Sequence, residues 1–328
     1  MIITRTPLRM SFAGGGSDIA SFYTRNGGCV LSTSIDKYIY ISIHPSFRRR
    51  DTVLKYSKTE IVEDISKIEH RIFGACLNKL GVSGVEIASN ADIPAGTGLG
   101  SSSTFTVGLL HALYAYKSKF VGKERLASEA CDIEISKLKE PIGKQDQYAA
   151  SYGGLKFYRF LKNGSVTVEP IIMDSDKRKS LEDNLIVFYT GDTRSASKIL
   201  AEQTVSIASG DKEKAQLKIC RLAEELKGEL ENGNIDAMGS ILHENWLLKR
   251  TLASGISSGA IDTYYDIALK SGAMGGKLLG AGGGGFLLFY APKNKHNDIK
   301  NALKDLSELK IRLDNQGSSI IYVGENSN

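Results

Sequence analysis

A glycine- and serine-rich segment occupies residues 93–104. It reads Ile-Pro-Ala-Gly-Thr-Gly-Leu-Gly-Ser-Ser-Ser-Thr and leads directly into the apolar stretch Phe105–Lys117. Glycine lets a backbone bend at positive φ and approach a ligand closely. The serines fall where a helix would start, and the free N–H groups and dipole of a helix start attract anions. The segment therefore predicts a phosphate-binding loop; the alternative is a glycine-rich turn that only caps a helix.

Two common glycine-loop signatures do not match this segment. The Walker pattern requires a lysine followed by Ser or Thr directly after the loop, and no lysine follows Gly100. The dinucleotide fingerprint requires three glycines at a different spacing and an acidic residue after the next strand. A phosphate loop at this position must therefore be of another kind.

The composition is ordinary for a globular protein, with 41% hydrophobic and 24% charged residues among 328. A chain of this length forms one large or two modest domains and buries roughly 75% of its unfolded surface. No stretch approaches the ~20 apolar residues of a membrane span, and the start, Met1–Arg5, lacks a secretory layout. These observations predict a cytoplasmic protein without a membrane partner.

The potential metal ligands and the basic residues are scattered. The four cysteines show no CxxC pairing and are expected to be reduced thiols, and the five histidines do not suggest a zinc site. The net charge of +5 is mild. The densest basic run, Arg48–Arg50, is expected to be a solvated hairpin tip, because a nucleic-acid surface would need a longer basic region with interleaved aromatics. No nucleic-acid partner is predicted.

Apolar periodicity predicts a mixture of strands and helices. In the first half we expect strands at 2–12, 30–34, 38–44 and 84–89, helices at 61–80, 102–117, 123–137 and from 145, and a hairpin at 155–160 and 166–172. In the second half we expect strands at 185–190, 286–290 and 318–323 and helices at 195–208, 213–231, 236–253, 262–270 and 295–308. The charged stretch 173–182 has no apolar period and predicts a boundary between domains 1–175 and 176–328. The fold class is α+β.

Three motifs in a fixed order resemble the GHMP kinase superfamily, named for galacto-, homoserine, mevalonate and phosphomevalonate kinases. The first contains Arg9 and residues 14–18. The second matches the P-x-x-x-G-L-G-S-S phosphate loop from Pro94 to Ser102, and the third matches K-x-x-G-A-G-G-G-G at residues 277–285. The resemblance spans nearly the whole chain. It implies a two-lobed fold, with an N-terminal lobe like ribosomal protein S5 and a C-terminal ferredoxin-like lobe.

The resemblance also implies ATP as phosphoryl donor and assigns the residues that bind it. They are Pro94, Gly96, Gly98, Leu99, Gly100, Ser101, Ser102 and Ser103, together with Gly282 and Gly283. Positioning and electrostatics would provide most of the rate acceleration. For the second glycine-rich segment, a tight turn between helix and strand is a further interpretation, compatible with the first.

The same resemblance implies a magnesium site and a catalytic carboxylate. Ser102 and Glu134 correspond to the metal ligands, which suit the preference of Mg²⁺ for hard oxygen donors. Residues 141–146 match a Pro-x-Gly-x-x-Asp pattern that ends at the catalytic Asp146, and Arg9 is expected to pair with it and keep it ionised. Glu134 lies 12 positions before Asp146, against 11 in the mevalonate kinase pattern. Without the resemblance, Glu134 would be interpreted as an exposed helix residue.

The first motif implies a sugar site. Arg9 and Asp18 reproduce the nine-residue spacing of galactokinase-like members, but Pro-Leu-Arg replaces Pro-Gly-Arg, and the residues before Asp18 also differ. The chain is therefore not expected to be a galactokinase. Asp18, with Ser17 and Gly16, would accept hydrogen bonds from sugar hydroxyls; the alternative role of Asp18 is a helix N-cap.

Residues 5–9, 15–18, 143–148 and 191–196 together resemble a narrower group, the bacterial D-glycero-D-manno-heptose 7-phosphate kinases. That group phosphorylates the anomeric hydroxyl of a sugar that already carries a phosphate, so a second anion site is implied. Arg194, Ser195 and Lys198 are expected to hold it, with Lys144 and Arg48 as weaker candidates. Another sugar 1-kinase, such as a fucose kinase, and a non-catalytic sugar sensor remain alternatives. A homodimer is compatible with the sequence.

Overall fold

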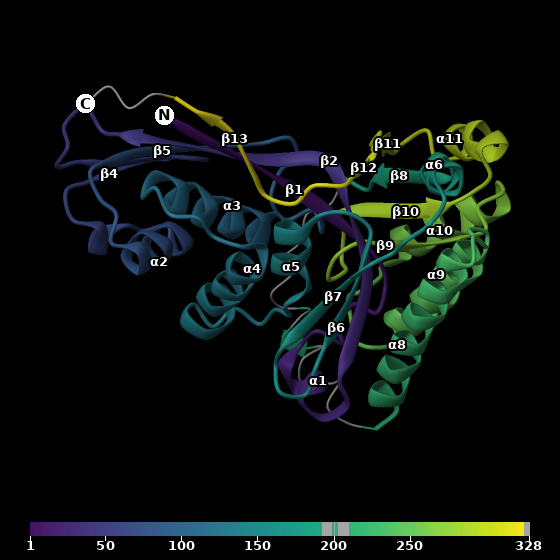
Figure 1. Cartoon of the computed structure of the whole chain (residues 1–328). Helices are drawn as coiled ribbons and strands as arrows, with labels where there is room; N and C mark the ends of the chain where they lie inside the picture. Colours follow the sequence, from purple (N-terminus) through teal and green to yellow (C-terminus); the bar gives the residue numbers. More distant parts are fainter. Residues whose placement is uncertain (192–198, 200, 203–209, 325–328) are drawn as a thin grey trace.

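The computed structural model in Figure 1 describes residues 1–191, 199, 201–202 and 210–324, and it is organised by two β-sheets. The strands of the larger sheet are β1 (Ile2–Ala13), β2 (Gly28–Pro45), β3 (Thr52–Lys55), β4 (Thr59–Val62), β5 (Val85–Ala91), β6 (Lys156–Phe160), β7 (Val166–Pro170), β12 (Leu313–Asp314) and β13 (Ser319–Val323). Within the described residues their order is β13-β1-β2-β5-β3-β4, with β6 and β12 also paired to β2, and β7 to β6. Only the β3–β5 pair is parallel among the described pairs.

Strand β2 joins two segments that the sequence predicts as separate strands. The structure has one strand of 18 residues in place of strands at 30–34 and 38–44. Tyr38 pairs with Pro7 and Ser34 pairs with Arg9, so residues 35–37 of β2 stand opposite Leu8 alone. A bulge of this kind bends a strand without reversing it. The predicted break is therefore a bulge and not a turn.

Helices cover one side of the larger sheet, as Figure 1 shows for α3, α4 and α5. The helices of this half are α1 (Ala20–Asn26), η1 (Ile65–Lys67), α2 (Arg71–Leu80), α3 (Ser101–Tyr116), α4 (Lys123–Cys131), the π-helix η2 (Asp132–Lys137) and α5 (Gln145–Tyr152). Helix α3 packs on β1 and β2 and is buried around most of its circumference. It therefore fixes the phosphate loop that precedes it against the centre of the sheet.

The helix predicted at 61–80 is shorter than expected and begins at Arg71. Before it, the buried carboxylate of Glu60 on β4 accepts hydrogen bonds from the backbone N–H groups of Glu69, at 2.7 Å, and His70, at 3.2 Å. These contacts hold the chain in a loop up to the helix start. Of the apolar residues in this stretch, Ile68 packs against the core, whereas Ile61 on β4 is exposed, so the helical spacing there does not mark one buried face.

The smaller sheet has the order β11-β8-β10-β9 and is antiparallel. Its strands are β8 (Leu185–Tyr189), β9 (Gly275–Leu278), β10 (Phe286–Tyr290) and β11 (Ser307–Glu308), and the described helices of this half are α6 (Ser175–Asp183), α8 (Gly210–Glu231), α9 (Ala237–Arg250), α10 (Gly259–Lys270), η3 (Lys293–Lys295) and α11 (His296–Ala302). Figure 1 shows α8 and α9 side by side, and α9 packs on β9.

In the second half, the structure adds a helix that the sequence does not predict and corrects the end of another, and one predicted helix falls outside the described residues. The charged stretch 173–182 contains the helix α6, which Asp174 caps and which buries only Leu181, so it has no apolar period. The helix predicted at 295–308 ends at Ala302, and the chain then enters β11. The helix predicted at 195–208 lies mostly on residues that the structure does not describe.

The end of the described chain returns to the larger sheet, where β13 pairs with β1 and β12 with β2. One buried apolar cluster also extends from β1 and α3 to α8 and β10. The two halves therefore share a core and a sheet. Among the described residues, no helix is long and apolar enough to cross a membrane.

Candidate functional site

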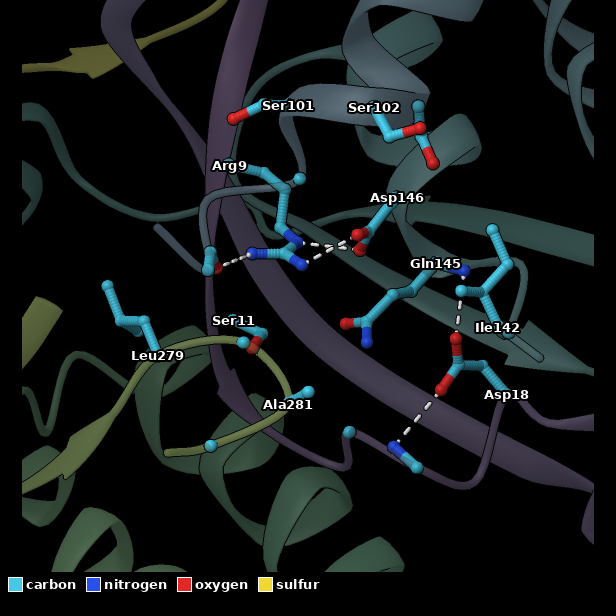
Figure 2. Close-up of a pocket in the computed structure, with 18 of the residues that line it drawn as sticks. Arg9, Ser11, Asp18, Ser101, Ser102, Ile142, Gln145, Asp146, Leu279 and Ala281 are labelled. Carbon is cyan, nitrogen blue, oxygen red and sulfur yellow. Dashed lines mark hydrogen bonds and ion pairs between the residues drawn. The ribbon is translucent and has the colours of Figure 1, made fainter. Parts of the chain in front are cut away.

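A cleft of about 250 Å³ opens between the two halves of the molecule. Its walls are the segment from β1 to α1, the loop before α3, the start of α5, and the loop between β9 and β10. Figure 2 shows Arg9 and Asp146 facing each other, with Asp18 nearby and with Ser101 and Ser102 on the far side from Leu279 and Ala281. All three sequence motifs therefore contribute to one cleft.

The phosphate loop presents a helix start to the cleft. Gly100 is the N-cap of α3, has a left-handed conformation with φ of +79°, and provides no side-chain cap. Ser101, Ser102 and Ser103 follow in the first turn and line the cleft. The Ser101 hydroxyl is buried and has no hydrogen-bond partner within the described structure. Free N–H groups with an unpartnered hydroxyl form a site suited to an anion.

The two glycine-rich loops touch each other. A Cβ atom at Gly98, where φ is +85°, would lie 2.6 Å from the Leu279 carbonyl oxygen, and one at Gly280 would lie 2.5 Å from the Gly98 Cα. A Cβ at Gly285 would lie 2.3 Å from the Thr97 carbonyl oxygen. Only glycine fits at these points, so the glycines set the distance between the loops.

Arg9 and Asp146 form a two-pronged ion pair. The Arg9 Nε and Nη2 atoms each donate to a carboxylate oxygen of Asp146 at 2.7 Å, and Nη1 donates to the Gly98 carbonyl oxygen at 2.7 Å. The Arg9 side chain is 4% exposed and that of Asp146 is 24% exposed. The arginine thus connects the carboxylate to the phosphate loop and orients it toward the cleft.

Asp18 lies in the cleft wall beside Gly143. Its two carboxylate oxygens accept the backbone N–H groups of Gly16, at 3.0 Å, and Gln145, at 3.1 Å. Burial raises the pKa of Asp18, and the nearby Asp146 raises it further, whereas the backbone hydrogen bonds oppose the shift. A Cβ at Gly143 would lie 1.9 Å from an Asp18 oxygen, so that glycine is what lets Asp18 sit there.

Ser102 and Glu134 meet behind the phosphate loop. The Ser102 hydroxyl donates to Glu134 at 2.8 Å, and the Gln147 amide donates to the other Glu134 oxygen at 2.7 Å. Glu134 is buried and not an exposed helix residue, and burial raises its pKa. It lies in the π-helix η2, where the N–H of Leu138 bonds the carbonyl of Ile133, five residues back. Hard oxygen donors at this spacing fit a small divalent cation beside a phosphate.

Some sequence-predicted site residues do not line the cleft. The Ser17 hydroxyl is buried and bonded to backbone atoms of Gly14 and Cys29, so it supports the loop from behind. Lys144 donates to the Gly164 carbonyl at 2.5 Å and lies over the Tyr23 ring. Arg48 lies in the turn that follows β2.

The predicted ATP-binding and sugar-binding glycines mostly line the cleft, namely Gly16, Gly96, Gly98, Gly100 and Gly282. The residues Pro94, Leu99 and Gly283 are not among its lining residues. Arg194, Ser195 and Lys198 lie outside the described residues.

Lys249 lines the cleft but was not predicted as a site residue. It lies in the last turn of α9, is 5% exposed, and donates to the Gly280 carbonyl. Its helical spacing from the buried Leu242 and Trp246 indicates the core-facing side of the helix. That signal predicts burial but not which residues the amine faces.

Comparisons with known proteins agree with these motifs. The GHMP kinases N-terminal domain matches residues 55–154, and the GHMP kinases C-terminal domain matches residues 226–308. The D-glycero-alpha-D-manno-heptose 7-phosphate kinase of Campylobacter jejuni is 30% identical, over 93% of this chain and 94% of its own length. The L-fucokinase/L-fucose-1-P guanylyltransferase of Bacteroides fragilis is 25% identical, over 88% of this chain and 34% of its own length.

A solved structure extends the agreement to the fold. The D-glycero-D-manno-heptose 1-phosphate kinase from Bacteroides thetaiotaomicron superposes with a TM-score of 0.81 and 25% identity, covering 99% of this chain and all of that chain. The two-lobed α+β fold implied by the motifs is thereby confirmed. The chain therefore belongs to the GHMP kinase family and is a phosphotransferase that uses ATP.

Proposed function

We propose that this kinase phosphorylates the anomeric hydroxyl of D-glycero-D-manno-heptose 7-phosphate, giving the 1,7-bisphosphate used to make nucleotide-activated heptose. The name of one relative, a heptose 7-phosphate kinase, supports this acceptor. The name of the solved structure, a heptose 1-phosphate kinase, supports only the coarser statement that a phosphorylated heptose is involved. The observation that carries the catalytic proposal is the two-pronged Arg9–Asp146 pair facing the start of α3. We further propose that the protein acts in the cytoplasm, without membrane or nucleic-acid partners.

In the proposed mechanism Asp146 receives the proton of the acceptor hydroxyl. The acceptor oxygen forms a bond to the γ-phosphorus of ATP, the bond from that phosphorus to the β,γ-bridging oxygen breaks, and ADP leaves with the electron pair. Arg9 holds both oxygens of Asp146, so the carboxylate is positioned before the acceptor binds. The N–H groups at the start of α3, with Ser101, would hold phosphate oxygens.

Magnesium completes the proposed site. Ser102 and Glu134 are the residues that would hold it, and Gln147 would orient Glu134. Among the described residues there is no group of three His, Cys, Asp or Glu that could hold a metal. In the proposed site, phosphate and water oxygens would supply the other ligands. The ion held there would neutralise negative charge on the phosphates.

Asp18 is the proposed contact for sugar hydroxyls, with the Gly16 backbone beside it. Both of its oxygens already accept one N–H, and each retains a second lone pair for a hydroxyl donor. We propose that Arg194 and Ser195 hold the 7-phosphate. Lys144 does not fit this role, because it is not among the residues that line the cleft. An R194A variant should lose affinity for the sugar phosphate and keep its affinity for ATP; unchanged acceptor affinity would refute this assignment.

The division of the chain also remains a proposal. We retain a boundary near residue 175, with domains 1–175 and 176–328. The pairing of β12 and β13 with β2 and β1 leads us to group the end of the chain with the first domain in space.

An acceptor panel tests the proposed function directly. ADP release would be measured with ATP, Mg²⁺ and a set of sugars and sugar phosphates, including the heptose 7-phosphate, the heptose without phosphate, and L-fucose. The proposal requires the highest kcat/KM for the heptose 7-phosphate. A preference for L-fucose would favour the fucokinase alternative, in line with a second relative. ADP release that stayed at background with every acceptor would favour a non-catalytic sensor.

A further inference from the structure

Lys249 is a buried cation at the wall of the cleft. It belongs to α9, in the second half of the molecule, and its amine contacts the carbonyl oxygen of Gly280 in the loop between β9 and β10. Taking an ammonium group out of water costs free energy unless ligands or charges compensate it. A buried lysine that lines a phosphate-binding cleft therefore suggests a role in binding an anion.

The charges that face Lys249 come from several elements. They are Arg9 on β1, Lys277 on β9, Asp18 in the segment after β1, and Asp146 on α5. Burial, and then Arg9, lower the pKa of Lys249 to about 8, and the two carboxylates oppose the shift. The amine consequently carries its proton at pH 7 and loses it in mildly alkaline solution.

Lys249 also retains hydrogen-bonding capacity. An ammonium group has three N–H donors, and the structure gives Lys249 one bond, to Gly280. The other basic residue of the cleft wall, Arg9, directs three of its nitrogen atoms at Asp146 and Gly98. Arg9 has two of its five N–H donors left, both on nitrogen atoms that already bond Asp146 or Gly98, whereas the two donors left on Lys249 belong to an amine that bonds a single carbonyl oxygen.

Its position is close to where phosphoryl donor and acceptor must meet. Gly280, which Lys249 holds, packs against Gly98 of the phosphate loop. The Gly98 carbonyl oxygen accepts a hydrogen bond from Arg9, and Arg9 also donates to the carboxylate of Asp146. During transfer, the phosphoryl group lies between the nucleotide and the acceptor, with negative charge spread over its three equatorial oxygens. A cation next to the Gly98–Gly280 contact is placed to meet that charge.

We propose that the Lys249 amine donates a hydrogen bond to an oxygen of the phosphoryl group in transit, which makes Lys249 a catalytic residue of this kinase. Lys249 keeps its proton throughout, while the bond to the acceptor oxygen forms and the bond to ADP breaks. The inference rests on the proposed kinase function, but it does not depend on which sugar is the acceptor.

The test compares K249M with a matched variant, R250M. Methionine has nearly the shape of the lysine stem without the charge, so we expect kcat to fall about a hundredfold, the typical effect of removing one electrostatic contact to a transition state. The acceptor KM and the ATP Kd should stay within about threefold. R250M removes a cation from the same helical turn, but Arg250 pairs with Asp262 outside the cleft, so kcat should stay within about twofold.

Each outcome bears on the proposal. A K249M kcat within about threefold of the wild type overturns it, even if the acceptor KM rises, because Lys249 would then bind only the acceptor's own phosphate. K249M removes a buried charge, which favours folding, but also the hydrogen bond to Gly280, so its melting temperature should change little. If K249M nevertheless fails to fold, the pH profile decides. The kcat/KM of the wild type should decline above about pH 8, and the kcat/KM of K249R should not decline there. A wild-type profile that stays flat to about pH 9.5 overturns the proposal, and so does a K249R profile that declines as the wild type does.

The acceptor panel keeps this test separate from the proposed function. The Lys249 variants are assayed with whichever acceptor the panel identifies. A different sugar would therefore refute the heptose proposal and leave the Lys249 experiment intact.

Discussion

Replacing Gly98 with alanine should separate the two glycine-rich loops and slow phosphoryl transfer. The added Cβ would lie 2.6 Å from the Leu279 carbonyl oxygen, so the loops must move apart by about 0.8 Å to reach an ordinary contact of 3.4 Å. The Gly98 carbonyl holds Arg9 at 2.7 Å, and Arg9 orients Asp146. A displacement near 1 Å in a catalytic group costs about a hundredfold in rate, or about 2.7 kcal/mol of activation free energy.

Gly96 offers a matched control. Its φ of +79° is close to the +85° of Gly98, but no atom lies within 4 Å of the point that a Cβ at Gly96 would occupy. Both G96A and G98A should lose roughly 1 kcal/mol of stability from the positive φ alone. Only G98A should add the cost of the clash, which is roughly 1–3 kcal/mol. The assay is steady-state ADP release together with thermal unfolding. A G98A kcat within about threefold of the G96A value would refute the argument that this contact positions Arg9.

Three further predictions address the proton acceptor, the metal and the thiols. D146N should lower kcat by about 10²–10⁴-fold at unchanged ATP affinity, because it removes the proposed base, and single-turnover kinetics with calorimetry would check this. S102A should raise the Mg²⁺ concentration needed for half-maximal rate by about tenfold or more, as measured by titration; an unchanged midpoint would exclude the serine as a ligand. Iodoacetamide at pH 7 should label Cys220 before the other three cysteines, because the interaction with Cys29 lowers the pKa of the Cys220 thiol. The same interaction, and then burial, raise the pKa of Cys29, and burial raises the pKa values of Cys76 and Cys131. Mass spectrometry that found equal labelling would contradict this account.

The parts of the site that the sequence predicts are those defined by local backbone geometry. Gly98 and Gly100 both adopt positive φ, which glycine permits, and Gly143 leaves the space that Asp18 occupies. Such requirements leave a recognisable residue at a fixed position. The pairing of Arg9 with Asp146, 137 positions apart, followed from the resemblance and not from any local pattern.

The parts that the sequence does not predict depend on contacts between distant segments. The apolar pattern of 318–323 predicts a strand, but it does not indicate that β13 pairs with β1. Likewise, the spacing that buries Lys249 contains no information about Gly280 or Arg9, which belong to other elements. Pairing and packing of this kind are set by the whole core, which local periodicity does not describe.

The spacing of Glu134 and Asp146 shows how a count along the chain can mislead about geometry. These residues lie 12 positions apart, one more than in the mevalonate kinase pattern, which raised the question of register. The structure has a π-helix at 132–137, and a π turn holds more residues than an α turn. With that π turn in place, Glu134 accepts a hydrogen bond from Ser102 at 2.8 Å, and its other oxygen accepts one at 2.7 Å from Gln147, the residue next to Asp146. The longer spacing therefore does not separate the two carboxylates, which remain connected through the adjacent residues Asp146 and Gln147 of α5.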